Sequence, residues 1–168
     1  MPGPDSRPAA AAVTILNRQR RQPVCRESLA ALAASVARRL GVGLELGIHL
    51  VSAREMARVN WQFLRHEGST DVITFDHGST ATHLHGELFI SIEDAESQAG
   101  EFGTDWNTEL ARYVIHGLLH LHGHDDLTPE PRRVMKRLEG RLVRQEAALA
   151  AGLKRVRPRR RSARTRRP

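Results

Sequence analysis

Four of the nine histidines and two aspartates fall within eleven consecutive residues, 116–126, which read His-Gly-Leu-Leu-His-Leu-His-Gly-His-Asp-Asp. Imidazole nitrogens and carboxylate oxygens are groups with which proteins bind zinc and similar cations. His116 and His120 are four residues apart, which suits two ligands on one side of a helix. The single cysteine, Cys25, is far from this stretch. The stretch therefore predicts a metal site, and not one of the closed, cysteine-rich structural type.

The residues before this cluster are expected to form a helix over 105–121. They include no proline, and Asp105 and Gly123 suit the positions that begin and end such a helix. On it, His116 and His120 would lie about 40° apart around the axis and roughly 6 Å apart along it, so both imidazoles could reach one ion. The apolar residues recur with helical spacing: Leu110, Val114, Leu118 and Leu121.

The two histidines lie on a different side of the predicted helix from its apolar residues. At about 100° per residue they share a side with Glu109 and Arg112, so we expect an open metal-binding face. Histidine ligands on an open face are typical of hydrolytic sites, which keep one coordination position for water.

A third ligand must come from beyond the helix, because a residue eight positions along a continuous helix lies about 12 Å away. Gly123 can turn the chain back toward the histidine pair. Candidates after the turn are His124, Asp125 and Asp126, and chemistry alone does not choose among them. His122 is expected to project to the opposite side of the helix.

Residues 116–126 resemble the signature of the YbeY family of metal-dependent single-strand endoribonucleases, which begins H-G-x-L-H-L-x-G and spaces its ligands as H-x3-H-x5-H. The resemblance implies a metal site of His116, His120 and Asp126, with aspartate where the family has its third histidine. Carboxylate oxygen also ligates zinc, so one Zn²⁺ ion is the implied cofactor. In the family the place of His124 is usually aromatic and is not a ligand.

A second motif supports the resemblance. Family members have an asparagine and an arginine before a T-[DN]-V-L-[ST]-F strand, followed by G-[DE]-I. In this sequence Asn60, Arg65, residues 70–75 and residues 86–88 match these positions. Arg65 is the candidate catalytic residue, because a guanidinium is always charged and pairs bidentately with phosphate.

The resemblance implies an α+β fold with a mixed, mostly parallel four-stranded sheet, packed with helices around a histidine-bearing central helix. The order of elements predicted from the sequence is compatible with this fold. We expect one domain over residues 13–151, between a disordered segment 1–12 and a disordered basic tail 152–168. The expected strands cover 13–17, 44–51, a segment ending at Phe75, and 87–92, and the expected helices cover 26–39, 53–64, 105–121 and 129–148.

The charge of the chain is concentrated in the tail. The formal net charge of the whole chain is +7, but nine of its 26 Lys and Arg residues lie within 152–168, which leaves 17 basic and 19 acidic residues elsewhere. We expect the tail to contact RNA non-specifically by displacing counterions. No apolar run is long enough to cross a membrane and no secretory signal is evident, so a cytoplasmic protein is expected.

The aromatic residues are few, seven in all. We expect Phe63, Phe75 and Phe89 to lie in the core. An RNA-binding protein that stacks bases on side chains would instead need exposed aromatic residues on a sheet or loop.

The resulting hypothesis is a metal-dependent endoribonuclease specific for single-stranded RNA, with a role in 16S rRNA 3′-end maturation and ribosome quality control. Its implied partners are single-stranded RNA, 16S rRNA and the small ribosomal subunit. One alternative is a metallopeptidase, since the spacing also resembles metzincins. Gly117, however, stands where their catalytic glutamate would be, and Glu87 or Glu109 is a conceivable replacement. Another is a ribosome assembly factor that holds a structural metal and cleaves nothing.

Overall fold

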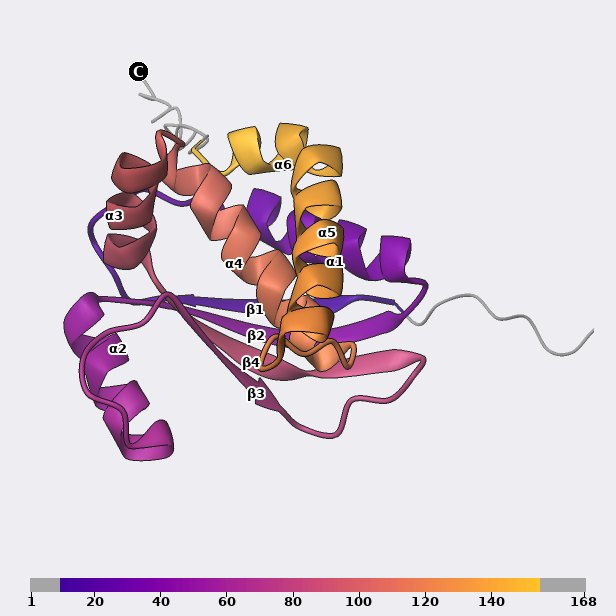
Figure 1. Ribbon diagram of the computed structural model, residues 1–168. Helices are drawn as coiled ribbons and strands as arrows, with labels where there is room; N and C mark the ends of the chain where they lie inside the picture. Colours follow the sequence, from indigo (N-terminus) through magenta and orange to yellow (C-terminus); the bar gives the residue numbers. More distant parts are fainter. Residues whose placement is uncertain (1–9, 155–168) are drawn as a thin grey trace, which may run out of the picture.

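The computed structural model describes residues 10–154 (Figure 1). Strands and helices alternate in the first half of the chain, and the second half is helical. The strands are β1 (Ala12–Asn17), β2 (Gly43–Val51), β3 (Val72–Asp76) and β4 (His83–Ser91). The helices are α1 (Arg26–Leu40), α2 (Ala53–Val59), α3 (Ile92–Phe102), α4 (Trp106–Leu121), α5 (Pro129–Gln145) and α6 (Ala147–Gly152), and a π-helical turn, η1 (Asn60–Leu64), continues α2.

The four strands form one sheet in the order β1-β2-β4-β3. Strands β1, β2 and β4 are parallel, while β3 pairs antiparallel with β4 at one edge. The sheet is therefore mixed and mostly parallel, and with the helices it makes the α+β fold that the sequence led us to expect.

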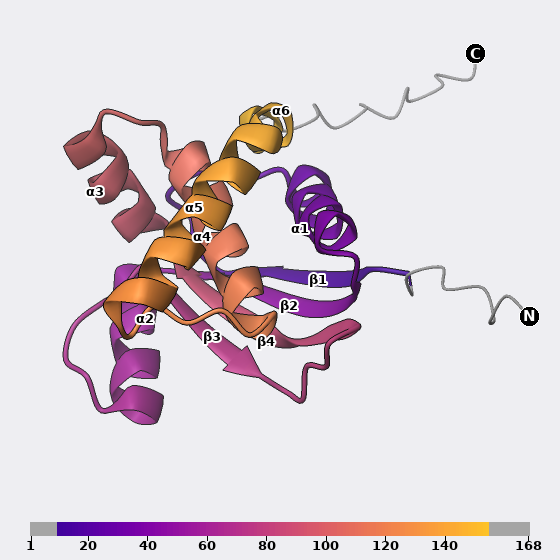
Figure 2. The ribbon, with the colours of Figure 1, turned by 45° about the vertical axis from the view of Figure 1, so that its right-hand side comes forward.

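The helices lie mainly on one face of the sheet (Figures 1 and 2). Helix α4 runs through the middle of this layer, between α1 and α3, and α5 crosses it on the outer side (Figure 2). Alternate residues of β2 and β4 face the helices and are fully or almost fully buried in the main core: Leu44, Leu46, Ile48, Leu50, Leu84, Leu88 and Ile90. Of the helices within residues 10–154, only α2 and η1 lie toward the other face, where Met56 and Val59 pack with Val51 and Ile73 in a small second cluster.

Local sequence signals explain several element boundaries. Ser52 caps α2 by accepting a hydrogen bond from the Glu55 backbone N–H at 3.2 Å, and Ser91 caps α3 in the same way. Gly41 ends α1 with a φ of 73°, a conformation that glycine adopts without steric cost. Asp105 stands at the N-cap position of α4, but its carboxylate pairs with Lys154 at 3.3 Å instead of capping the helix.

The last predicted helix, over 129–148, is two helices. The break falls at Glu146, which is buried and accepts hydrogen bonds from Ser35 and Arg39 of α1. The turn between α5 and α6 brings this carboxylate to α1. Within α5, Leu142 is buried and Val134 is exposed.

The boundaries of the domain also differ slightly from those expected. Strand β1 begins at Ala12, the last residue of the segment expected to be disordered. At the other end Leu153 is buried in the core, so the folded chain continues into the expected tail. The rest of that tail, 155–168, lies outside the described residues, as do residues 1–9. No helix within residues 10–154 is long and apolar enough to span a bilayer.

Candidate metal centre

Helix α4 packs closely against the sheet at two glycines. A Cβ atom on Gly117 would lie 2.4 Å from Leu88 Cδ2, and one on Gly86 would lie 2.8 Å from Leu121 Cδ2. Both distances are too short for real atoms, so only glycine permits this approach. The side of α4 that holds Gly117 therefore faces the sheet, and a glutamate there would point into the core.

His116 and His120, predicted ligands on α4, converge with Asp126 from the loop that follows. The two Nε2 atoms are 3.0 Å apart, and the Asp126 carboxylate oxygens lie 3.6 Å from His116 Nε2 and 3.7 Å from His120 Nε2. One ligand atom from each residue falls within 4.8 Å of the other two. All three side chains are only partly buried, so the group is reachable from solvent.

The outer nitrogen of each imidazole is already engaged. His116 Nδ1 lies 2.9 Å from Glu139 Oε2, and His120 Nδ1 lies 3.1 Å from the backbone oxygen of His124. An oxygen acceptor at Nδ1 favours a proton on that nitrogen, and in the neutral imidazole Nε2 then carries the lone pair. Each histidine is thus oriented to bind a cation through Nε2.

Glu139 of α5 belongs to a partly buried chain of charges. Its other oxygen accepts a hydrogen bond from Arg112 Nη1 at 3.1 Å, and Arg112 Nε donates to Glu109 at 3.2 Å. Burial raises the pKa of Glu139, but hydrogen bonds and charges from His116 and Arg112 outweigh it and hold that pKa below its usual value. Burial alone would lower the pKa of His116. Interactions with Glu139 and Asp126 outweigh burial and raise that pKa above its usual value.

Helix α5 also corrects the expectation of an open helix face. The side of α4 that holds the histidines carries Glu109, as predicted, but Glu109 is only 2% exposed. Glu139 and Arg112 fill the space between α4 and α5. The face is open only at the end where the two histidines lie.

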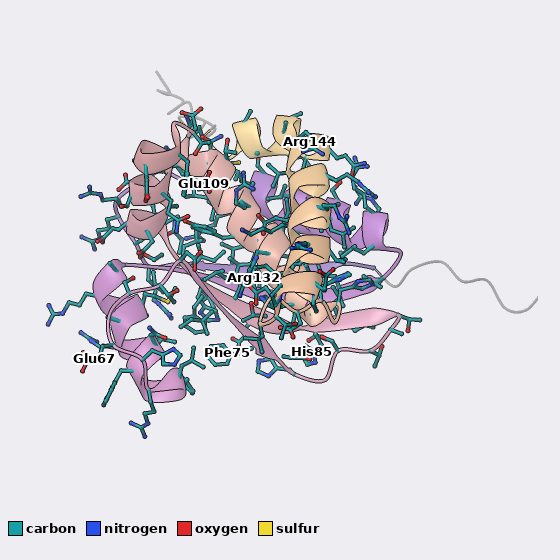
Figure 3. The ribbon with its side chains drawn as sticks, viewed as in Figure 1. Glu67, Phe75, His85, Glu109, Arg132 and Arg144 are labelled. Atoms are coloured by element: carbon teal, nitrogen blue, oxygen red, sulfur yellow. The ribbon has the colours of Figure 1, made fainter. Side chains whose placement is uncertain are left out.

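The turn after α4 determines which residue joins the histidines. Gly123 has a φ of 95°, and the His124 N–H returns to the Leu119 carbonyl at 3.0 Å. This turn directs the His124 side chain toward His122, with ring nitrogens 3.4 Å apart, and away from the Nε2 pair. Arg132 of α5 then holds the loop by donating to the Asp126 backbone oxygen at 2.8 Å (Figure 3).

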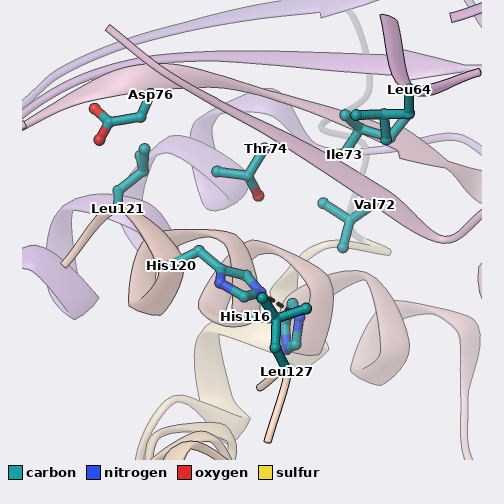
Figure 4. Close-up of a pocket in the computed structure, with 9 residues that line it drawn as sticks. All are labelled: Leu64, Val72, Ile73, Thr74, Asp76, His116, His120, Leu121 and Leu127. Carbon is teal, nitrogen blue, oxygen red and sulfur yellow. Dashed lines mark hydrogen bonds between the residues drawn. The ribbon is translucent and has the colours of Figure 1, made fainter. Parts of the chain in front are cut away.

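A cavity of about 460 Å³ opens beside the two histidines, between α4 and edge strand β3. Figure 4 shows His116 and His120 on one side and residues of β3 opposite them. Leu64 of η1 and Leu127 of the loop between α4 and α5 also line it. The volume falls in the range typical of small-ligand sites and suits a nucleotide-sized group.

Arg65, the candidate catalytic residue, does not line this cavity, although its neighbour Leu64 does. The guanidinium carbon of Arg65 lies 5.8 Å from the centre of the Trp61 ring. Arg65 is also the one non-glycine residue within 10–154 that has a positive φ, 56°. It is thus near the mouth of the cavity, on the η1 side, in contact with an exposed aromatic residue.

The donor set fits a divalent transition metal. Two imidazoles with free Nε2 lone pairs and one carboxylate are the ligands of many catalytic zinc sites. The hydrogen bonds at Nδ1 are the supporting interactions that such sites use to orient histidine. Zinc is one of several cations that accept this set.

Comparison with known proteins agrees with the geometry. The family model described as Endoribonuclease YbeY matches residues 13–146. The chain belongs to the YbeY family. This match covers both motifs and all elements from β1 to α5.

Individual YbeY relatives give the same result. The chain is 38% identical over 112 residues to the Endoribonuclease YbeY of Bacteroides thetaiotaomicron, covering 67% of this chain and 79% of the relative. It is 37% identical over 117 residues to that of Bacteroides fragilis, covering 70% and 81%. The fold also resembles the solution structure of TM1509 from Thermotoga maritima, with a TM-score of 0.59 and 24% identity over 89% of this chain and 99% of that one.

The two carboxylates considered as a peptidase base lie away from the centre in this YbeY-family chain. Glu87 is on the other face of the sheet, bound by His49 and His77. Glu109 is buried against Arg112 and Thr104. Neither lines the cavity, so neither supports a metzincin-like mechanism.

Sequence reasoning missed Glu139 altogether. It is 23 residues from His116 in the chain and follows Leu138, a core residue of an otherwise very polar helix. Its only signal is that it shares the α5 face of Met135 and Leu142, three or four residues away on either side.

Proposed function

We propose that this protein is a metal-dependent endoribonuclease that cleaves single-stranded RNA, with Zn²⁺ held by His116, His120 and Asp126. We further propose that it acts in the cytoplasm in 16S rRNA 3′-end maturation and ribosome quality control, on the small ribosomal subunit. Membership of the YbeY family supports the reaction class.

One observation carries the proposal. His116, His120 and Asp126 come from a helix and the loop after it, yet each presents a ligand atom within 4.8 Å of the others. Because Glu139 and a backbone oxygen occupy both Nδ1 atoms, the free lone pairs point toward the carboxylate.

The metal ligands, their supporting residues and Arg65 have separate roles in cleavage. When bound, a divalent cation lowers the pKa of water and polarises a phosphodiester oxygen. Glu139 and the His124 carbonyl keep His116 and His120 oriented, so the site is formed before RNA arrives. Arg65 is our candidate for binding the phosphate and stabilising the charge that develops on phosphorus.

The test is incubation of metal-replete, nuclease-free protein with single-stranded RNA and with the corresponding duplex. His120→Ala should abolish cleavage, because it removes a ligand. His77→Ala is the matched control, since His77 also pairs with a carboxylate but lies on the opposite face of the sheet. We expect the parent and His77→Ala to cleave only the single strand; equal cleavage by His120→Ala would show that the metal centre is not the active site.

A further inference from the structure

A row of aromatic side chains crosses the sheet face turned away from the helices and ends on η1. His49 of β2 stacks on Phe89 of β4 with ring centroids 4.2 Å apart, and Phe89 meets Phe75 of β3 edge to face at 5.6 Å. Phe63 of η1 ends the row, 5.1 Å from Phe75. Because the inner rings are anchored in the sheet, Phe63 is held in a fixed orientation.

Phe63 was expected in the core, and that expectation is wrong. The side chains of Phe63 and Trp61 are 56% and 51% exposed, and Leu64 between Phe63 and Arg65 is 45% exposed. Three exposed large apolar residues in four positions form a patch that marks a binding surface. Two of them are aromatic, which is what a protein that stacks unpaired bases requires.

Three arginines lie beside this patch. The positive φ of Arg65 folds the chain back, so that its guanidinium lies over the Trp61 ring at 5.8 Å. Arg54 and Arg58 are exposed, lie four residues apart on one side of α2, and precede Trp61 by seven and three residues. Glu55, the acidic residue of α2, is neutralised by Arg18 at 2.8 Å. The charge complements a phosphate backbone.

The patch is continuous with the metal cavity. Leu64 follows Phe63 directly and lines the cavity together with His116 and His120 (Figure 4). A polymer with one phosphate in the cavity could therefore continue over η1.

We propose that Trp61 and Phe63 form a platform on which unpaired RNA bases stack, while Arg54 and Arg58 bind the adjoining phosphates. The inference rests on the proposed function and assigns it a source of selectivity. Bases in a duplex are already stacked on both faces and present only their edges, so a duplex cannot use the platform. Single strands are then favoured by binding, before any chemistry.

The test measures binding of a short single-stranded RNA and of its blunt duplex to the full chain. Chelator is present to stop cleavage, and the RNA is checked for integrity afterwards. Trp61→Ala should weaken single-strand binding about tenfold, the value of one stacked base, and leave duplex binding unchanged. The salt dependence of binding should not change, because no charge is lost.

Three further variants separate stacking from other causes. Trp61→Phe should keep most of the affinity, whereas Trp61→Leu, apolar but without an aromatic face, should not. Phe102→Ala is the matched control, since Phe102 is 66% exposed at the end of α3. It should have no effect.

The outcomes also distinguish this inference from the proposed function. If the parent neither binds nor cleaves single-stranded RNA, the proposed function fails. If the parent does both and Trp61→Ala binds the single strand equally well, the platform is overturned. This holds even if the variant loses binding to another protein, because the patch would then be a protein-binding surface. Parallel loss of single-strand and duplex binding would overturn it too.

Discussion

Two clusters of histidine and carboxylate lie on opposite sides of the sheet, and within residues 10–154 only the one of His116, His120 and Asp126 has the geometry of a metal centre. On the helix side, the Nε2 atoms of His116 and His120 converge and Glu139 binds from behind, at Nδ1. On the other face, Glu87 lies between two imidazoles and accepts a hydrogen bond from each Nε2, at 2.8 Å from His49 and 2.9 Å from His77. Residue types alone would not distinguish the clusters. They differ because separate oxygens occupy the Nδ1 atoms of His116 and His120, whereas Glu87 occupies both Nε2 atoms of its own pair.

The most severe test of this comparison removes the carboxylate of the metal group. Asp126→Ala should lose most of the bound metal, because two imidazoles hold a cation weakly, and Asp126→His should retain it. His124→Ala should change metal content little, since its imidazole faces His122. Metal analysis of the purified variants decides, and loss of metal in His124→Ala with retention in Asp126→Ala would move the third ligand to His124.

The second test concerns the positive charge of Arg65. Arg65→Ala should lower the rate of RNA cleavage about 100-fold or more with little change in metal content, as for loss of a donor that acts on the transition state. Arg65→Lys should recover only part of it, because an ammonium cannot pair bidentately. The measurement is a single-turnover rate at saturating RNA, which separates chemistry from binding. A parent-like rate in Arg65→Ala would exclude a catalytic role.

The third test addresses the carboxylate behind His116. Glu139→Gln keeps the shape of the side chain and an oxygen acceptor but removes the charge that Arg112 and His116 share. We expect metal affinity to fall about tenfold, as for other outer carboxylates of metal-bound histidines. Competition with a chelator measures it. Glu130→Gln, an exposed change at the start of the same helix, is the control and should have no effect.

The smallest effect is expected on the opposite face. Hydrogen bonds from His77 and His49 hold the pKa of Glu87 below its usual 4.5, although burial opposes them. A depressed carboxyl pKa stabilises the fold above the unfolded value, and this contribution disappears as pH falls through the folded value. Because Glu87 is 40% exposed, the loss in Glu87→Gln should be at most about 0.5 kcal/mol.

Urea unfolding of Glu87→Gln and the parent at several pH values measures this contribution. The difference in stability should be full at pH 7 and shrink below about pH 4.5. Metal content should be unchanged. Loss of metal in this variant would show that the two clusters are not separate.

The parts of the site that lie close together in sequence were predictable. The apolar spacing of α4 and the histidine pair one turn apart are local patterns, and the structure has both as predicted. Gly123 was predicted to turn the chain, and its φ of 95° does so. Such patterns depend only on helix geometry, which sequence spacing reports directly.

The parts that depend on packing between distant segments were not predictable. Glu139 reaches His116 only because α5 crosses α4, and no local pattern encodes that crossing. The break at Glu146 likewise serves Ser35 and Arg39, more than 100 residues earlier in the chain.

The aromatic residues failed for a different reason. Phe63 follows α2 in an apolar helical pattern, which gave no sign that the helix continues as a π-helical turn. A π-helical turn rotates side chains away from the α-helical pattern, so periodicity no longer reports burial. Phe75 and Phe89, on regular strands, are partly covered beside the second cluster, which is closer to the expectation.

The contact between Gly117 and Leu88 also limits how this protein can evolve. Metzincins place their catalytic glutamate at the position of Gly117, so the two kinds of enzyme differ here by one residue in otherwise similar spacing. Here that residue cannot be gained alone, because even one added carbon would lie 2.4 Å from Leu88. A lineage would first have to shorten Leu88 and then move α4 away from β4, losing core packing before any new chemistry could repay it. Close helix-to-sheet packing thus separates two kinds of hydrolase that look adjacent in sequence.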